Sequence, residues 1–236
     1  MLEVLQTEEQ IIHARQAMRR AGRSVLEGRM AQVLRRLRLN RRLPVGDLVK
    51  SWDVARTLNF IDDTLPKDAP ILDLGAYCSE VPVALARMGY SAIHGVDLNP
   101  RVMVMPHADR VRYHVSDFMS TPFDAGSFAA VTAISVIEHG YAPERLFAEL
   151  GRLLRPGGYF IASFDYWPER IDTGDTRFFD LSWLIFSEQD VLQLIAEAAR
   201  HGFQVAGELN PAANERPIHC QGFDYTFGWL VLRKDG

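Results

Sequence analysis

The stretch from Pro70 to Pro100 constrains the fold of this chain most, because it predicts a strand, a turn, a helix and a second strand in immediate succession. An apolar strand begins at Ile71 and stops at Gly75, where glycine can take backbone angles closed to other residues. Apolar residues then recur at helical spacing, and the second strand closes on Asp97. A right-handed βαβ unit of this kind has a ligand crevice at the carboxyl ends of its strands.

The charge at that crevice separates two classes of ligand. A dinucleotide carries a pyrophosphate, which binds backbone N–H groups at a helix N-terminus and is repelled by a nearby carboxylate. Here Asp73 precedes Gly75 by two residues, and the second and third glycines of the dinucleotide fingerprint are absent. A carboxylate in this position suits a ligand with an ammonium and a sulfonium group, such as S-adenosylmethionine. Asp97 can accept two hydrogen bonds from a ribose diol, which both ligand classes contain.

Further motifs extend this pattern along the chain. They are ILDLG (71–75), GVDLNP (95–100), VSDF (115–118), SFAAVTAISVIEH (127–139) and LLRPGG (153–158). In their order and spacing they resemble the class I S-adenosylmethionine-dependent methyltransferases, from about residue 50 to about residue 232. The glycine motif is degenerate, because Tyr77 and Ser79 stand where the family usually has its further glycines.

The resemblance implies roles for individual residues in binding S-adenosylmethionine. Asp73 and Gly75 would contact the methionine part, and Asp97 with Leu98 would contact the ribose. Asp117 and Phe118 would contact the adenine, and Ser135 would line the same pocket. These cofactor-binding residues are, in chain order, Asp73, Gly75, Asp97, Leu98, Asp117, Phe118 and Ser135.

The resemblance also implies an α/β, Rossmann-like fold. Its seven-stranded, mostly parallel sheet would be flanked by helices, with the last strand antiparallel between the fifth and the sixth. The apolar run from Phe128 to Ile137 fits a central parallel strand buried on both faces. We divide the chain into a basic helical extension (1–45) and a methyltransferase-like domain (46–236) with a lid insertion at 166–186.

The extension differs from the rest of the chain in charge. Residues 1–50 hold eleven Lys or Arg and five acids, which gives +6, whereas the whole chain has a net charge of −4 and the remainder therefore −10. Helices are predicted from Glu8 to about Arg20, after a capping-box pattern, and through Leu26 to Leu37. Such an arginine-rich tract can bind nucleic acid or anionic lipid. We favour the alternative, a helical appendage with solvated arginines that docks on the acidic body or on a second subunit.

The composition indicates the class of protein and the compartment in which it works. The 236 residues, 47% of them apolar, are ordinary for a globular protein, and no apolar run reaches the ~18 residues that a membrane span needs. Only two cysteines occur, Cys78 and Cys220, which argues against a disulfide framework and indicates a cytoplasmic protein. The histidines are scattered, so no metal site is predicted.

The acceptor is expected at the ends of the fourth and fifth strands. His139 there is the candidate general base, because its ordinary pKa lies near neutrality, and the alternative is a residue that packs beside the cofactor. The loop from Tyr166 to Phe186 has the length of a functional lid. Within and beside it, Asp165, Trp167 and Arg177 are predicted to contact the acceptor.

Taken together, the sequence predicts methyl transfer from S-adenosylmethionine to an oxygen or nitrogen of a small or saccharide-like acceptor. The alternative is a non-catalytic protein that keeps the fold for binding or assembly, which the missing glycines and the arginine-rich extension favour. A dinucleotide oxidoreductase is disfavoured by the carboxylate of Asp73.

Overall fold

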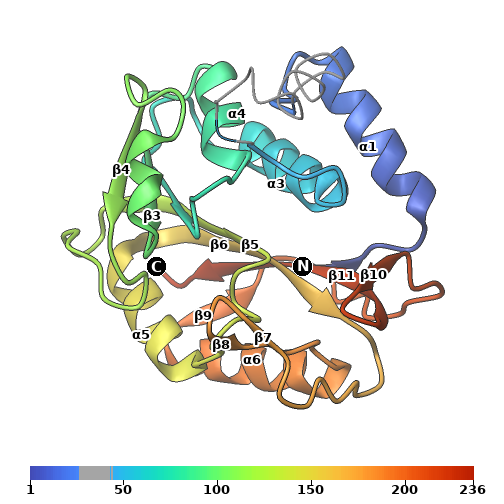
Figure 1. The fold of residues 1–236 in the computed structure, drawn as a ribbon. Coiled ribbons are helices and arrows are strands. Elements are labelled where there is room, and N and C mark those ends of the chain that lie inside the picture. The colour runs from blue at the N-terminus through green and yellow to red at the C-terminus, as the bar shows by residue number, and fades with distance from the viewer. Residues whose placement is uncertain (27–42, 44) are drawn as a thin grey trace.

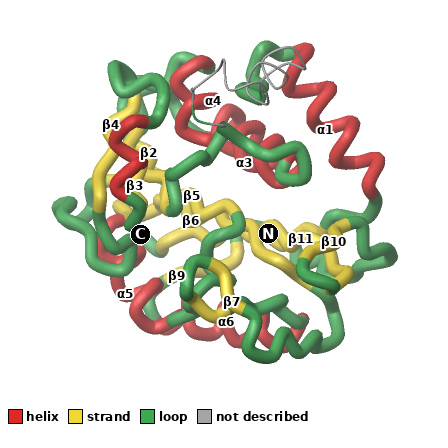
Figure 2. Tube along the Cα trace, viewed as in Figure 1, coloured by secondary structure: helices red, strands yellow, loops and turns green. Residues whose placement is uncertain are grey.

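The structure is a computed structural model that describes residues 1–26, 43 and 45–236. Figure 1 shows a central sheet with helices on both sides, and Figure 2 separates the helices from the strands. The helices are α1 (Glu8–Arg20), α3 (Ser51–Thr64), α4 (Val81–Arg87), the 3₁₀ helix η1 (Pro100–Val104), α5 (Pro143–Leu153) and α6 (Glu188–Arg200). The strands are β1 (Leu2–Val4), β2 (Ile71–Leu74), β3 (Ile93–Asp97), β4 (Val111–Val115), β5 (Phe128–Ile134), β6 (Leu154–Tyr166), β7 (Arg177–Phe178), β8 (Leu181–Ser182), β9 (Phe203–Val205), β10 (Ile218–Cys220) and β11 (Phe223–Lys234).

The main sheet has the order β1-β11-β6-β5-β2-β3-β4, with β9 and β10 also paired to β11. The strands β6, β5, β2, β3 and β4 are parallel to one another, and β11 is antiparallel to all of its partners. The predicted Rossmann-like class is confirmed, including the antiparallel last strand between β6 and β9. The sheet has nine strands instead of seven because β1 and β10 also pair with β11.

Two apolar cores lie on the two faces of the sheet. Alternate strand residues point to opposite faces, so Ile71 joins one core while the adjacent Leu72 joins the other. Helices α1, α3 and α4 cover the first face, and α5 and α6 cover the second (Figure 1). Because both faces are covered, the ligand-accessible part of the parallel strands is their carboxyl edge.

The N-terminal segment contributes to the sheet as well as to the helical layer. Leu2, Val4 and Leu5 are buried, and Leu2 pairs with Leu230 in β11. The predicted helix from Glu8 is confirmed as α1, whereas the predicted second helix and most of the arginine-rich tract lie outside the described residues. The strand β1 was missed because three residues are too few to show an alternating pattern.

A buried ion pair ties this segment to the domain. The guanidinium of Arg15 in α1 donates to both carboxylate oxygens of Glu80, at 2.7 and 2.8 Å, and both side chains are almost fully buried. Arg15 also donates to Ser51 Oγ at 2.9 Å, at the start of α3. The division of the chain at residue 45 remains a prediction, and Arg15 is covered by protein rather than presented to a nucleic acid.

Candidate functional site

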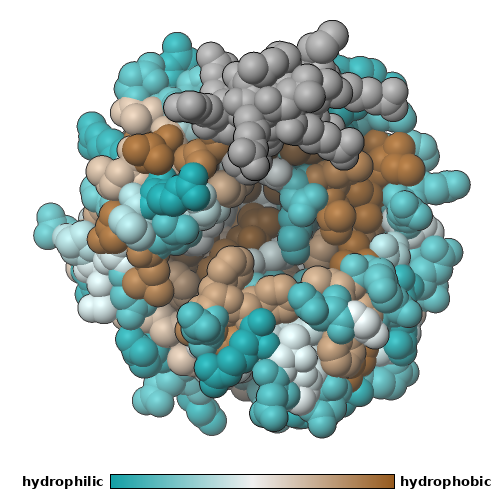
Figure 3. Space-filling model, viewed as in Figure 1, coloured by the Kyte–Doolittle hydropathy of each residue, from teal (hydrophilic) through white to brown (hydrophobic). Residues whose placement is uncertain are grey.

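A cavity of about 700 Å³ opens at the carboxyl edge of the parallel strands. Figure 3 shows a hollow near the centre of this face, with hydrophobic residues in its depth. The walls come from the segment before α3, from the loops after β2, β3, β4 and β5, and from the tip of the β7–β8 hairpin. The lining residues are Gly46, Asp47, Lys50, Val54, Gly75, Tyr77, Cys78, Ser79, Glu80, Asp97, Leu98, Asn99, Phe118, Ile134, Ser135, Val136, His139, Phe179 and Leu181.

Gly75 lies on the wall at the end of β2, and the backbone there requires glycine. Its φ is +68°, in the left-handed region, and a Cβ at this position would lie 2.5 Å from Val136 Cγ2. The loop after β2 can therefore approach the loop after β5 only because this residue has no side chain. Two residues on, Tyr77 also lines the cavity, so a phenol ring stands where the family usually has a glycine.

Asp97 ends β3 and links the loop after β2 to the loop after β3. Its carboxylate accepts hydrogen bonds from the backbone N–H of Tyr77 at 2.9 Å and of Asn99 at 2.7 Å. A carboxylate has about four lone-pair positions, so two remain for a ligand. Asp97 and the neighbouring Leu98 both line the cavity, and their contact with a ribose remains a prediction.

Asp73 lies beneath the cavity and is not one of the residues that line it. Its side chain is buried, and Oδ1 accepts a hydrogen bond from Thr132 Oγ1 at 2.5 Å. Burial is the largest of the effects that raise the pKa of Asp73 to about 7. The structure therefore places this carboxyl between β2 and β5, and its contact with a cofactor remains a prediction.

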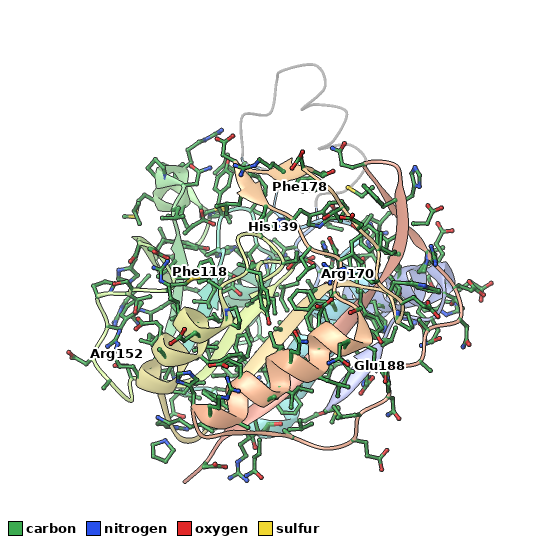
Figure 4. The ribbon with its side chains drawn as sticks, turned by 90° about the horizontal axis from the view of Figure 1, so that it is seen from below. Phe118, His139, Arg152, Arg170, Phe178 and Glu188 are labelled. Atoms are coloured by element: carbon green, nitrogen blue, oxygen red, sulfur yellow. The ribbon has the colours of Figure 1, made fainter. Side chains whose placement is uncertain are left out.

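The predicted adenine pair is divided between the cavity and the surface. Phe118 lines the cavity, whereas Asp117 points outward, accepts from Met119 N–H at 2.9 Å and pairs with Arg145 at 3.3 Å. Figure 4 shows Phe118 and His139 at the same edge of the sheet, while Arg152 lies away from them by α5.

On the opposite side of the cavity, Lys50 reaches the end of β5. Its ammonium hydrogen-bonds Ser135 Oγ, lies 4.0 Å from Asp165 Oδ1 and sits 3.9 Å above the ring of Phe227. Ser135 has a left-handed φ of 51°, which ends β5 three residues before the predicted Ile137 and turns the chain into the cavity wall. Sequence reasoning missed Lys50, although it stands at the start of the helix that precedes the first motif.

Three buried carboxyl groups surround this lysine, namely Asp53, Glu138 and Asp165. Asp53 accepts from Ser163 Oγ at 2.7 Å, and Asp165 accepts from Trp183 Nε1 at 2.7 Å, but neither oxygen of Glu138 has a hydrogen-bond partner in the described part of the chain. Burial raises the pKa of Asp53 to about 6 and that of Asp165 above its usual range. Burial, and then the charge of Asp165, raise the pKa of Glu138 well above its usual range.

His139 lines the cavity beside the hairpin. Its ring lies 5.5 Å from that of Phe178 and 5.8 Å from that of Phe179, and Figure 4 shows His139 and Phe178 together. Nδ1 is buried and has no hydrogen-bond partner among residues 1–26, 43 and 45–236. Burial, and then the charge of Lys50, lower the pKa of His139 to about 4, so the imidazole is neutral at pH 7.

The predicted lid forms a small hairpin, and the residues that reach the cavity from it are not those chosen from the sequence. Phe179 and Leu181 line the cavity. Arg177 is exposed and donates to the carbonyl of Asp180 at 2.8 Å, and Trp167 stacks under the guanidinium of Arg216 at 4.1 Å. Asp165 lies behind Lys50. The aromatic composition of the loop predicted a contact surface, but it did not indicate which ring would face the cavity.

Comparison with known proteins gives a family for the central part of the chain. Residues 72–162 match the family described as "Methyltransferase domain". A protein of Mycobacterium sp. (strain JLS), described as an uncharacterized methyltransferase, is 34% identical over 107 residues, which are 44% of this chain and 42% of that protein. The chain thus matches less than half the length of this curated relative.

Solved structures share the fold at low sequence identity. The cyclase SpnF has a TM-score of 0.59 and 17% identity, with 80% of this chain and 83% of that chain covered. Geranyl diphosphate C-methyltransferase from Streptomyces coelicolor A3(2) has a TM-score of 0.57 and 18% identity, with 76% and 78% covered. No helix in the described part of the chain is long and apolar enough to cross a bilayer. Residues 72–162 therefore match a methyltransferase domain, and the chain has the Rossmann-like fold of solved S-adenosylmethionine-dependent methyltransferases.

Proposed function

We propose that the cavity binds S-adenosylmethionine and that the protein transfers its methyl group to an oxygen or nitrogen atom of a small-molecule acceptor. The observation that carries the proposal is one continuous cavity that joins Gly75 and Asp97 to Lys50, Ser135 and His139. The same cavity therefore offers lining residues for both the methyl donor and the acceptor. Positioning of the two reactants against each other is the main source of rate acceleration in such a transfer.

The residues of the donor half fit this cofactor. Asp97 keeps free lone pairs beside the cavity after its two backbone contacts, as a ribose diol requires. Gly75 leaves a space that a Cβ would fill, and Phe118 offers an apolar surface for a base. When bound, the cofactor supplies an electrophilic methyl group on a sulfonium.

The residues of the acceptor half orient the attacking atom and hold its proton. Ser135 and the neutral imidazole of His139 can each hydrogen-bond an oxygen or nitrogen atom in the cavity. Lys50 places a positive charge beside them, which stabilises an acceptor oxygen as it loses its proton. Asp165 does not line the cavity, so the proton would reach it through Lys50, whose ammonium passes one proton to Asp165 as it takes up the acceptor's proton. The apolar walls give less support to a saccharide acceptor, which would need more hydrogen-bonding partners.

The test is calorimetric titration with S-adenosylhomocysteine. Asp97→Ala removes the charged acceptor of two ribose hydrogen bonds, each worth ~1.5–3 kcal/mol, so we expect affinity to fall at least about tenfold. Asp63→Ala, at an exposed position on α3, is the control and should bind like the wild type. Equal binding by the wild type and Asp97→Ala would remove the assignment of the donor site.

The alternative is a non-catalytic protein of the same fold, and the phenol ring of Tyr77 on the cavity wall favours it. Under this alternative, the wild type has no measurable affinity for S-adenosylhomocysteine, whereas Tyr77→Gly, which restores the family residue, gains it. Binding by the wild type would exclude the alternative in its simplest form.

A further inference from the structure

The tip of the β7–β8 hairpin has an unfavourable backbone for the residues that occupy it. The strands are joined by Phe179 and Asp180, whose φ angles of 56° and 63° are both left-handed. A two-residue turn with both angles positive strongly favours Asn-Gly. A bulky aromatic in this region is a genuine outlier, and such strain lowers stability and concentrates at functional sites.

The hairpin is fixed to the wall of the cavity, so the strain is not relieved by movement of the loop. Gly140 N–H donates to Ser182 O at 2.9 Å, and Leu184 N–H donates to Glu138 O at 3.0 Å. Thr173 Oγ1 adds a bond of 2.6 Å to Trp183 O. The segment after β5 and the hairpin therefore form one unit, and the turn must present its side chains at a defined place.

That place is the opening of the cavity. Phe179 is 84% exposed, the highest value among the exposed large hydrophobic residues of the described chain, and it also lines the cavity together with Leu181. Val54, Ile134 and Val136 continue the apolar wall inward. The exposed phenylalanine ring and the strained turn each lower the stability of the free protein. Both features are explained if an apolar ligand covers the ring.

We propose that Phe179 and Leu181 bind an apolar part of the methyl acceptor, which makes the acceptor an amphipathic molecule. Its reacting oxygen or nitrogen lies at Lys50, Ser135 and His139, and its hydrocarbon chain or ring system extends along the apolar wall to the hairpin. This inference rests on the proposed function, because it uses the same cavity. A small ligand is favoured over a protein partner because the residues concerned line a concave opening (Figure 3).

The test compares short and long probes of the same head group by calorimetry, with S-adenosylhomocysteine at saturation. The probes are 1-propanol with 1-octanol, and propylamine with octylamine. Each buried methylene contributes about 0.8 kcal/mol, so the octyl compound of the preferred head group should bind at least about tenfold more tightly than its propyl partner.

Phe179→Asn separates a binding role from a structural role. Asparagine tolerates the left-handed backbone, so the variant should unfold at the same temperature as the wild type or higher, while its octyl-probe affinity falls at least about tenfold. Affinity for S-adenosylhomocysteine should not change. Leu192→Gln, at a 46% exposed position on α6 away from the cavity, is the matched control and should bind both probes like the wild type.

Three results would overturn the inference. The first is equal affinity for propyl and octyl probes, and the second is an octyl affinity that both Phe179→Asn and Leu181→Ser leave intact. The third is a Phe179-dependent dimer in sedimentation with no change in probe affinity, which would make the hairpin a subunit interface. Failure of the proposed function gives a different result, because the wild type then does not bind S-adenosylhomocysteine. In that case the probes are titrated against the protein without S-adenosylhomocysteine.

Discussion

The two sides of the cavity differ in how their polar groups are satisfied. On the donor side, Asp97 accepts from two backbone N–H groups, and Glu80 is held by both arms of Arg15. On the acceptor side, both oxygens of Glu138 and Nδ1 of His139 are buried with no hydrogen-bond partner among the described residues. Asp73 lies between the two sides, and its Oδ1 accepts a hydrogen bond from Thr132 Oγ1.

Under the proposed function, this difference separates a donor side suited to one constant ligand from an acceptor side suited to proton transfer. Satisfied polar groups fix the donor loops in one arrangement before any ligand binds, which lowers the cost of binding. Buried groups without partners cost stability and have shifted pKa values, which is the usual state of groups that handle protons. Under the function proposed above, the acceptor side therefore bears the energetic cost of reactivity.

The largest expected effect comes from a matched pair of substitutions on the two sides. Glu80→Gln removes the charge that balances the buried Arg15, and breaking a buried pair in this way costs about 3 kcal/mol or more. Glu138→Gln should change the free energy of unfolding by about 1 kcal/mol or less, since Glu138 has a raised pKa and a glutamine resembles its neutral form.

Urea denaturation at pH 7 measures both free energies of unfolding. Arg200→Ala, which breaks an ion pair with a largely exposed arginine, should cost ~1 kcal/mol at most and shows the scale of a surface pair. Equal losses for Glu80→Gln and Glu138→Gln would mean that the two sides do not differ as described.

The next effect concerns Asp73, between the two sides. Its pKa of about 7 in the folded protein lies above its ordinary value, so the folded state binds a proton that the unfolded state has already lost. Its contribution to stability is therefore complete below about pH 4 and is lost as the pH rises to about 7. Relative to Asp73→Asn, the wild type should lose up to about 1.4 kcal/mol of unfolding free energy per pH unit within that window.

Urea denaturation of both proteins at several pH values from 4 to 8 gives this difference directly. Asp63→Asn, at an exposed position, is the control for the loss of one negative charge. A difference between wild type and Asp73→Asn that stays constant across the range would show that Asp73 is not held protonated.

Sequence reasoning predicted the donor side better than the acceptor side, for a physical reason. Gly75, Asp97 and Phe118 follow strands at fixed intervals in the motifs, and a strand end fixes where the next residues lie. Lys50 reaches the cavity from another part of the chain, and Phe179 reaches it through a turn that its sequence disfavours. Local sequence patterns indicate neither position, because long-range packing places Lys50 in the cavity and a strained backbone places Phe179 there.

The smallest and most specific expected effect concerns the protonation of His139. A histidine that acts as a general base near neutral pH has a pKa in that range and contributes 10²–10⁴-fold to the rate. Burial and the charge of Lys50 instead lower the pKa of His139 to about 4, so its imidazole should remain neutral from pH 5 to pH 8. Nuclear magnetic resonance of the histidine ring signals measures this directly, and His139→Gln assigns the signal by its disappearance.

We expect no titration of that signal above pH 5 in the wild type. Lys50→Met removes one of the two causes of the lowered pKa, so the midpoint should then move up toward the ordinary value, while burial keeps it below about 6.5. A wild-type midpoint between pH 6 and 7 would restore His139 as a candidate base. A low midpoint that Lys50→Met leaves unchanged would show that burial alone controls His139 and that Lys50 does not act on it electrostatically.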